Sequence, residues 1–411
     1  MTPVHSITRS IHLRGRPRGR FALGLSLLLA LPALAAEEFP ACRERLAAHA
    51  LAQGIPPGLV EATVPALEQQ QRVLELDQQQ PEFIQTFAAY VDRRVSPERV
   101  SRGRQMLAKH GDFLADLQRR HGVPARYLVA FWGLETNYGG YLGNMPTLDS
   151  LATLACDPRR ATFFTREFVN ALRLMDRESL EAEHMVGSWA GAVGHTQFMP
   201  SSYLRYAVDG DGDGKIDLWR SERDALASGA NFLKALGWQP GLRWGRLVRL
   251  PPDFDYRWAG RDQSAPLASW SSRGVLRANG GPLPGTDVTA ALLVPAGHAG
   301  PAFLVYDNFD VIMRWNQSQS YALSVGLLAD RLAGAPPADY GDPETPPLPI
   351  AELKHAQQAL LDRGLDPGPL DGVLGSRTRA ALRAFQLEVR LPADGYPDAA
   401  TLNALRADAA E

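Results

Sequence analysis

The spacing of apolar and polar residues changes several times along the chain, and each change predicts a different kind of structure. From Phe39 to about Leu117 the pattern is helical and rich in polar residues, which predicts amphipathic helices. Residues from about 123 to 238 hold the densest aromatic and small-residue content. One helix there carries Tyr127, Phe131 and Glu135 at i, i+4 and i+8. A single carboxylate therefore shares the core-facing stripe of that helix.

Between residues 240 and 301, short apolar runs alternate with glycine and proline. This pattern predicts short strands and hence a small β-rich insertion. The predicted strands of the insertion are 247–250, 269–271 and 290–294. Residues 303–306 predict a further strand, and helical spacing returns from Tyr321 to Leu332. The expected fold class is mainly α with a small β-rich insertion.

A proline-rich stretch separates these elements from a compact C-terminal unit. Residues 334–347 predict an extended, semi-rigid linker that does not pack. Beyond it, a pattern of an Asp-Gly pair, a threonine and a leucine occurs twice, as Asp371-Gly372, Thr378 and Leu382, then as Asp394-Gly395, Thr401 and Leu405. Each copy predicts a turn followed by a threonine near a helix start. Residues 348–411 thus predict a small helical domain of three-helix type.

The first 35 residues predict a secretory signal peptide. Arginines precede an apolar run from Phe21 to Leu31, and a small-residue cleavage site follows at 33–35. The run is too short to span a bilayer, and Cys42 lacks the preceding small residues of a lipid-attachment site. We therefore expect no membrane anchor and a periplasmic location.

Charge and cysteine content narrow the possible functions. Cleavage after residue 35 removes five arginines and no acidic residue, so the formal net charge of −2 becomes −7. Nucleic-acid binding normally needs a basic patch, so we expect no nucleic-acid partner. Cys42 and Cys156 are the only cysteines. They can form one disulfide in an oxidising compartment, but two separated thiols cannot make a metal site.

Glu135 is the first candidate for chemistry. A carboxyl group on an apolar stripe loses hydration, which raises its pKa. A protein can keep an acid protonated at neutral pH in this way, ready to donate to a leaving group. The alternative, which this segment leaves open, is a glutamate at a helix end that faces solvent.

A second candidate segment runs from Gly187 to Tyr203. Ser188, Gln197 and Tyr203 offer neutral hydrogen-bonding groups suited to sugar hydroxyls and N-acetyl amides. Glycines among small residues let a backbone approach a ligand closely. Tight packing of helices through these glycines is the alternative.

Residues 209–217 match the first part of an EF-hand loop. Aspartates at alternate positions converge on a hard cation, Gly214 permits the sharp turn, and the seventh position supplies a backbone carbonyl. The twelfth position holds Arg220 in place of the usual glutamate. A metal-free acidic turn is the alternative, but aspartates this close repel one another without a cation, so we expect structural Ca²⁺. The expected ligands in the loop are Asp209, Asp211, Asp213 and Lys215.

These segments together resemble the lytic murein transglycosylase B family, in a soluble form without the lipid anchor. The resemblance covers about Phe39 to Leu332. The matching stretches are 133–139, 150–155, 191–203, 209–219, 231–238 and 314–318. It implies a lysozyme-like core within a catalytic region spanning 36–333, with the β-rich insertion at about 240–301. The implied substrate is peptidoglycan, cleaved at its MurNAc-β-1,4-GlcNAc bond.

By this resemblance, Glu135 is the single catalytic acid and base. It protonates the glycosidic oxygen, then accepts a proton from the C6 hydroxyl of the same MurNAc as that hydroxyl attacks C1. The implied product is a 1,6-anhydromuramoyl end, formed without water. Most glycosidases need a second carboxylate, and this mechanism does not.

Other site residues are also implied by the resemblance. Ser188 and Gln197 match family positions that line the saccharide groove. Asn316 matches the asparagine of the family motif at 314–318, and Tyr321 is implied to be a stacking platform nearby. Arg159 and Arg160 match positions associated with the peptide stem, whose carboxylates suit guanidinium groups; the alternative for this pair is a solvated helix start. The calcium ligand missing at position twelve is expected slightly later, at Asp224 or Glu222. His195 and Trp315 depart from the family, because tyrosines are common at both positions.

The C-terminal unit resembles the peptidoglycan-binding domain type 1 family, which implies non-catalytic wall binding. The match rests on 370–375, Thr378, 381–382, 385–386 and 394–395. The implied protein is a monomer that binds glycan strands and needs no organic cofactor. Two rival functions remain, a lysozyme-type hydrolase that uses water and a second carboxylate such as Asp149 or Glu167, and a non-enzymatic wall-binding scaffold.

Overall fold

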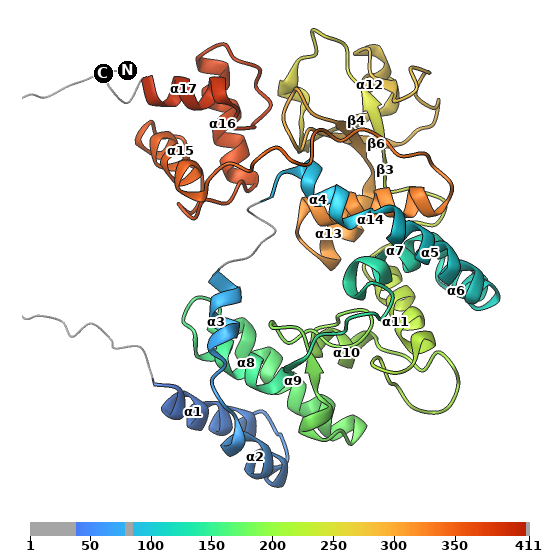
Figure 1. The fold of residues 1–411 in the computed structure, drawn as a ribbon, viewed down its shortest axis with the longest axis vertical. Helices are drawn as coiled ribbons and strands as arrows, with labels where there is room; N and C mark the ends of the chain where they lie inside the picture. The colour runs from blue at the N-terminus through green and yellow to red at the C-terminus, as the bar shows by residue number, and fades with distance from the viewer. Residues whose placement is uncertain (1–37, 79–84, 408–411) are drawn as a thin grey trace, which may run out of the picture. The chain divides into compact units, whose positions relative to one another are not determined.

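Helices make up most of the residues that the computed structural model describes, which are 38–78 and 85–407 (Figure 1). In these two stretches no helix is both long enough and apolar enough to cross a membrane. The predicted signal peptide lies outside the described residues. The helices that precede the larger sheet are α1 (Phe39–Ala52), α2 (Pro57–Thr63), α3 (Gln71–Gln78), α4 (Phe87–Arg94), α5 (Pro97–Lys109), α6 (Gly111–His121), α7 (Ala125–Thr136), α8 (Thr147–Cys156), α9 (Ala161–Glu178), α10 (Pro200–Tyr206) and α11 (Glu222–Ala235).

Helix α7 runs through a large apolar cluster. Its residues from Tyr127 to Leu134 are all buried, and it packs against α5 and α14 (Gln319–Leu332). The backbone amide of Trp244 donates to the hydroxyl of Tyr127 at 3.2 Å, which satisfies the polar end of that ring inside the core. Because α7 is enclosed along its length, its C-terminal turn has a fixed position.

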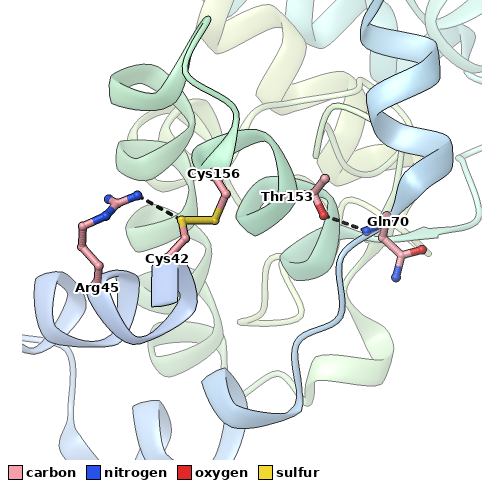
Figure 2. Close-up of a disulfide and its surroundings, with 5 residues drawn as sticks. All are labelled: Cys42, Arg45, Gln70, Thr153 and Cys156. Atoms are coloured by element: carbon pink, nitrogen blue, oxygen red, sulfur yellow. Dashed lines mark hydrogen bonds between the residues drawn. A yellow bond between two sulfur atoms is a disulfide. The ribbon is translucent and has the colours of Figure 1, made fainter. Parts of the chain in front are cut away.

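A disulfide joins α1 to α8 (Figure 2). Cys42 of α1 is bonded to Cys156, the last residue of α8, across 114 residues of sequence. Close by, the backbone amide of Gln70 donates to the hydroxyl of Thr153 at 2.9 Å. The sequence left the pairing of the cysteines open, and the structure shows that they are bonded. The N-terminal segment is therefore attached to α8 at two places.

A five-stranded antiparallel sheet has the order β4-β6-β7-β3-β5. Within it, Leu247 lies opposite Phe303, and Leu292 lies opposite Leu304. A smaller sheet pairs β1 (Met145–Pro146) with β2 (Val186–Gly187). The strands of the larger sheet are β3 (Gly245–Arg249), β4 (Gly260–Pro266), β5 (Leu276–Arg277), β6 (Thr289–Leu293) and β7 (Ala302–Val305).

The prediction of one strand, at residues 269–271, was wrong. Residues 269–271 belong to a helix, α12 (Leu267–Ser272), and not to the sheet. Pro266 precedes the first turn, where a proline is well tolerated. Leu267 and Trp270, three residues apart, are buried on the same face, and the indole of Trp270 donates to the backbone oxygen of Ala290 at 2.9 Å. The run was too short for its periodicity to separate a strand from a single helical turn.

After the sheet, α13 (Asp307–Trp315) and α14 return the chain to α7. The linker that follows contains no helix or strand between residues 335 and 349. The expectation that it does not pack was wrong at one position. Tyr340 stacks on Phe303 with ring centroids 6.4 Å apart and meets the edge of Phe87. Burial of this phenol raises the pKa of Tyr340 to about 12.

The C-terminal unit contains α15 (Ile350–Asp362), α16 (Ser376–Glu388) and α17 (Ala399–Ala407). Its sequence repeat forms a repeated hydrogen-bond network. Gln357 accepts from the backbone amide of Gly372 at 2.8 Å, and its side-chain amide donates to Asp371 and Thr378. The second copy makes the same bonds among Gln386, Asp394, Gly395 and Thr401. A buried glutamine thus holds each Asp-Gly turn onto the helix that precedes it.

The disulfide leads to a prediction about stability. Replacing both Cys42 and Cys156 by serine should lower the free energy of unfolding by about 4 kcal/mol, because the bond closes a long loop in the unfolded chain. Chemical unfolding of the oxidised protein and of the double variant measures the difference. A reducing agent should destabilise the wild-type protein and leave the double variant unchanged. Equal stability of the two proteins would contradict the prediction.

Candidate active site

Glu135 lies in the last turn of α7, half-buried beside the core. The helix ends directly after it, because Asn137 takes a left-handed conformation with φ of 51°, which asparagine tolerates well at helix ends. Tyr138 and Gly139 continue with positive φ, so the chain turns sharply away from the carboxyl group. Of the two alternatives for Glu135, the structure favours the core-facing side chain over the solvent-facing one.

Two donors from the α13–α14 region reach the same oxygen of Glu135. The indole Nε1 of Trp315, the last residue of α13, donates to Oε1 at 2.9 Å. The hydroxyl of Tyr321, in the first turn of α14, donates to Oε1 as well. Tyr321 is only 3% exposed, so the expectation that its ring serves as a stacking platform for a sugar was wrong. Burial is the main reason that the pKa of this phenol is raised well above 10, and the negative charge of Glu135 raises it further. The hydroxyl of Tyr321 therefore keeps its proton.

Aromatic rings surround the indole of Trp315. The ring centroids of Phe131, Phe198 and Phe232 lie 4.5, 5.5 and 5.1 Å from that of Trp315. These residues come from α7, from the segment before α10 and from α11. The carboxyl group of Glu135 therefore stands next to a mainly apolar wall. The sequence did not predict the hydrogen bond from Trp315 to Glu135. The one signal that pointed to this position was the tryptophan in place of the family's usual tyrosine.

The turn between α13 and α14 sets the positions of both donors. The side-chain oxygen of Asn316 accepts from the backbone amide of Ser318 at 3.0 Å. Ser318 in turn caps α14, because its hydroxyl accepts from the amide of Tyr321 at 3.2 Å. Asn316 therefore shapes the turn that carries Trp315 and Tyr321 to Glu135. Its expected contact with a saccharide stays a prediction.

Ser188 and Gln197 are held in a tight turn after β2. The hydroxyl of Ser188 accepts from the amide of Ala192 at 3.1 Å. The side-chain amide of Gln197 donates to the backbone oxygens of Leu142 and Gly194, both at 3.0 Å. Gln197 thus links this segment to the loop between α7 and β1. Saccharide binding by Ser188 and Gln197 stays a prediction.

The glycines of this segment serve packing within the protein. A Cβ atom on Gly191 would lie 2.4 Å from the side chain of Leu151, and one on Gly194 would lie 2.6 Å from the backbone oxygen of Leu218. Both residues also have positive φ. The structure therefore favours close internal packing over the close approach of a ligand at these two positions.

His195 contacts α7 through two hydrogen bonds. Its Nδ1 accepts from the indole of Trp132 at 3.0 Å, and its backbone oxygen accepts from the hydroxyl of Thr136 at 2.8 Å. Burial lowers the pKa of His195, which favours the neutral ring that this acceptor role requires. Histidine, in place of the tyrosine that is common in the family, therefore helps to attach the segment from Gly187 to Tyr203 to α7.

Arg159 and Arg160 both form ion pairs with Asp77 of α3. Arg159 also donates to the backbone oxygen of Asp77 at 2.9 Å. The Asp77 carboxylate is almost fully buried, so the pair of arginines meets an internal acid. The two arginines are therefore not simply solvated at a helix start, because both pair with Asp77. Recognition of peptide-stem carboxylates by the two arginines stays a prediction.

The acidic loop brings the oxygens of Asp209, Asp211 and Asp213 within 4.8 Å of one another. Gly212 and Gly214 have positive φ, which allows this tight turn. The backbone amides of Gly214 and Gly212 donate to Asp209 and lower the pKa of its carboxyl group. Three converging carboxylates form a donor set that suits Ca²⁺.

Asp224 lies beside the acidic loop but outside this cluster. Its two oxygens accept from the backbone amides of Gly210 and Asp217, each at 2.8 Å. Burial raises the pKa of Asp224. Glu222, the other candidate, forms an ion pair with Lys109, and Nε2 of His110 lies 2.9 Å from the same carboxylate oxygen. Lys215 donates its backbone amide to Asp213. The ligand roles of Asp224 and of the Lys215 carbonyl stay predictions.

Comparison with known proteins relates this arrangement to solved structures. The family model of the transglycosylase SLT domain matches residues 38–330, and that of a peptidoglycan binding domain matches residues 351–405. The crystal structure of SltB3 from Pseudomonas aeruginosa in complex with NAG-anhNAM-pentapeptide is 44% identical, with a TM-score of 0.84. The match covers 90% of this chain and 100% of that chain.

Two proteins of Escherichia coli are also similar. The membrane-bound lytic murein transglycosylase B of strain K12 is 33% identical over 250 residues, which are 59% of this chain and 66% of that protein. The structure of the lytic transglycosylase Slt35 in complex with calcium is 29% identical with a TM-score of 0.62, and the match covers 71% of this chain and 92% of that chain. These similarities confirm the expected fold class, a lysozyme-like helical core with small antiparallel sheets and a helical C-terminal domain.

The buried imidazole of His195 leads to a prediction about pH. The unfolded chain binds a proton at His195 below about pH 6.5, whereas the folded protein binds it only at a lower pH, because burial lowers that pKa. Stability is therefore lost as the pH falls below this value. His195→Gln keeps an acceptor for Trp132 but cannot titrate, so the loss between about pH 7 and pH 5 should become smaller. Urea unfolding at several pH values measures it.

His184→Gln is the matched control for this prediction, because His184 is exposed on the surface. This variant should lose as much stability on acidification as the wild-type protein. The prediction would be contradicted if His195→Gln and the wild-type protein lost stability equally.

Proposed function

The chain belongs to the family of the transglycosylase SLT domain, which makes it a lytic transglycosylase, and we propose that it cleaves the MurNAc-β-1,4-GlcNAc bond with Glu135 as acid and base. The observation that carries this proposal is the position of Glu135, at the end of a buried helix and held by Trp315 and Tyr321. A carboxyl group fixed in an apolar setting is suited to hold and release a proton.

In the proposed reaction, protonated Glu135 gives its proton to the glycosidic oxygen while the bond from that oxygen to C1 of MurNAc breaks. The C6 hydroxyl of the same sugar then attacks C1, and Glu135 accepts the proton from that hydroxyl. The enzyme returns to its starting state, and the product is a 1,6-anhydromuramoyl end. No water is consumed. The relative SltB3 was crystallised with NAG-anhNAM-pentapeptide, an anhydro sugar of this class.

The surroundings of other carboxylates support a single catalytic acid. Asp149 accepts from the backbone amide of Glu68 at 2.7 Å. Glu167 is 1% exposed and accepts from the backbone amide of Ser201 at 3.0 Å. Both groups therefore serve backbone contacts. This weakens the rival proposal of a hydrolase, which uses a second positioned carboxylate.

We further propose that Ser188, Gln197 and Asn316 line the saccharide groove, with the buried Tyr321 acting on Glu135 from behind it. Tyr321 touches Glu135 directly, and the side chain of Gln197 supports the loop between α7 and β1. For Arg159 and Arg160, binding of a stem carboxylate has to compete with Asp77. The proposed groove thus surrounds the proton-carrying group with mainly neutral hydrogen-bonding side chains.

The proposal also covers location and attachment to the wall. A signal peptide at residues 1–35 would deliver a monomeric enzyme to the periplasm, and the disulfide suits that oxidising compartment. The C-terminal domain would bind peptidoglycan. Joined to the catalytic region by residues 334–347, it would raise the local concentration of glycan strands.

Calcium is the proposed structural ion at Asp209, Asp211 and Asp213, completed by the carbonyl of Lys215 and by Asp224. The convergence of the three carboxylates supports this site, and the relative Slt35 was crystallised with calcium. When bound, the ion would neutralise the repulsion among these carboxylates and hold the loop before α11. It takes no part in the proposed chemistry at Glu135.

The product of wall digestion tests the proposed reaction. Sacculi digested by the wild-type protein should release muropeptides one water lighter than hydrolytic products, as read by mass spectrometry. Glu135→Gln should slow this release by at least about 100-fold and leave wall binding unchanged. Glu183→Gln, a change at an exposed position, should have no effect. Products with only reducing muramic ends would contradict the transglycosylase reaction, and an active Glu135→Gln would remove Glu135 from it.

Thermal unfolding with calcium tests the proposed ion site. Calcium at about 100 times its dissociation constant should stabilise the folded protein by about 2.7 kcal/mol, and a chelator should reverse this effect. Asp211→Asn should abolish the gain because it removes a charged ligand. Asp253→Asn, at an exposed position outside the loop, should retain the gain. An unchanged melting temperature in calcium would count against the site.

A further inference from the structure

We propose that Trp315 is a positioning residue that determines which oxygen of Glu135 moves the proton. Together with Tyr321 it keeps Oε1 as a permanent hydrogen-bond acceptor, so the proton leaves from Oε2 and returns to Oε2. This inference deepens the proposed function and rests on it, because the choice of oxygen matters only if Glu135 is the acid and base.

The indole carries the assignment, because its N–H group can donate a hydrogen bond but cannot accept one. Nε1 of Trp315 lies 2.9 Å from Oε1 of Glu135. An acidic proton on Oε1 pointing toward the indole would collide with the N–H hydrogen. Oε1 therefore accepts from Trp315 whether Glu135 is protonated or ionised.

The hydroxyl of Tyr321 completes the arrangement on the same oxygen. Each carboxyl oxygen offers about two acceptor positions. With the indole in one position and the phenol in the other, no position on Oε1 is left for the acidic proton. Tyr321 is almost fully buried, so its hydroxyl has little access to water as an alternative acceptor.

The position of the indole is itself fixed by packing. Phe131, Phe198 and Phe232 contact the ring from three segments of the chain. Behind it, a Cβ atom on Gly229 of α11 would lie 3.8 Å from the indole, in ordinary contact. The ring therefore has little room to rotate, and the direction of its N–H bond is set by the core.

The arrangement has a chemical consequence for the two halves of the proposed reaction. When Glu135 is protonated on Oε2, Oε1 is the carbonyl oxygen and still accepts both bonds. When Glu135 is ionised, the same two bonds stabilise its charge. Neither donor has to move between the states, so one oxygen can deliver the proton and recover it without rotation of the carboxyl group.

The pH dependence of wall lysis tests the role of Trp315. Trp315→Phe keeps an aromatic ring but removes a donor to the ionised carboxylate, which raises the pKa of that group. The alkaline limb of kcat/KM, along which protonated Glu135 is lost, should therefore move up by about one pH unit. The readout is the initial rate of release of soluble muropeptides from sacculi across the pH range.

Two further variants separate this effect from a packing effect. Tyr321→Phe removes the other donor to Oε1 and should move the limb in the same direction. Phe232→Leu trims the packing around the indole without touching the bond to Glu135, and the limb should stay in place. If thermal unfolding shows that Trp315→Phe does not fold, Tyr321→Phe carries the test.

The inference would be overturned if the alkaline limb of kcat/KM did not move in folded Trp315→Phe and Tyr321→Phe. It would also be overturned if Phe232→Leu moved the limb by the same amount. Failure of the proposed function is recognised separately, because Glu135→Gln would then still lyse the wall.

A crystal structure of Glu135→Gln with a bound glycan oligosaccharide tests the choice of oxygen directly. The amide oxygen should occupy the position of Oε1 and face Trp315, since an amide NH₂ group there would oppose the indole N–H. The NH₂ group should then take the position of Oε2 and donate to the glycosidic oxygen. A glycosidic oxygen bound on the Trp315 side of the amide would overturn the assignment.

Discussion

Burial of α7 fixes the position of Glu135, and the other parts of the site are arranged around that position. The helix is enclosed from Tyr127 to Leu134, so its end cannot move without disturbing the core. The left-handed residues after Thr136 end the helix and leave the carboxyl group at the edge of the packed region. The packing that stabilises the fold is thus the same packing that orients the carboxyl group of Glu135.

The periodicity of the chain assigned Glu135 to the core-facing stripe of its helix, because helical spacing records which side chains face the core, but it left a solvent-facing glutamate open. It could not predict the partners of Glu135. Trp315 and Tyr321 are 180 and 186 residues away in sequence, and their contact with Glu135 depends on how α13 and α14 return after the sheet. Local sequence patterns do not show how distant helices pack against one another, so these two hydrogen bonds could be found only from the structure.

Other differences between expectation and structure have similar causes. The glycines at 191 and 194 were compatible with an open groove or with close packing, and the neighbours that decide the matter, Leu151 and Leu218, lie elsewhere in the sequence. For Arg159 the sequence allowed a ligand-binding role or a solvated helix start, and the structure pairs it with Asp77 from an earlier helix. Composition suggests what a side chain can bind. The nearest available group in the folded chain decides what it does bind.

The disulfide between α1 and α8 also bears on when the enzyme becomes mature. For a chain exported N-terminus first, as proposed, Cys42 crosses the membrane well before Cys156, which follows 114 residues later. The bond can therefore close only after the chain through α8 has been translocated, and a precursor retained in a reducing cytoplasm cannot form it. A wall-degrading enzyme built in this way acquires its covalent cross-link only on the side of the membrane where its substrate lies.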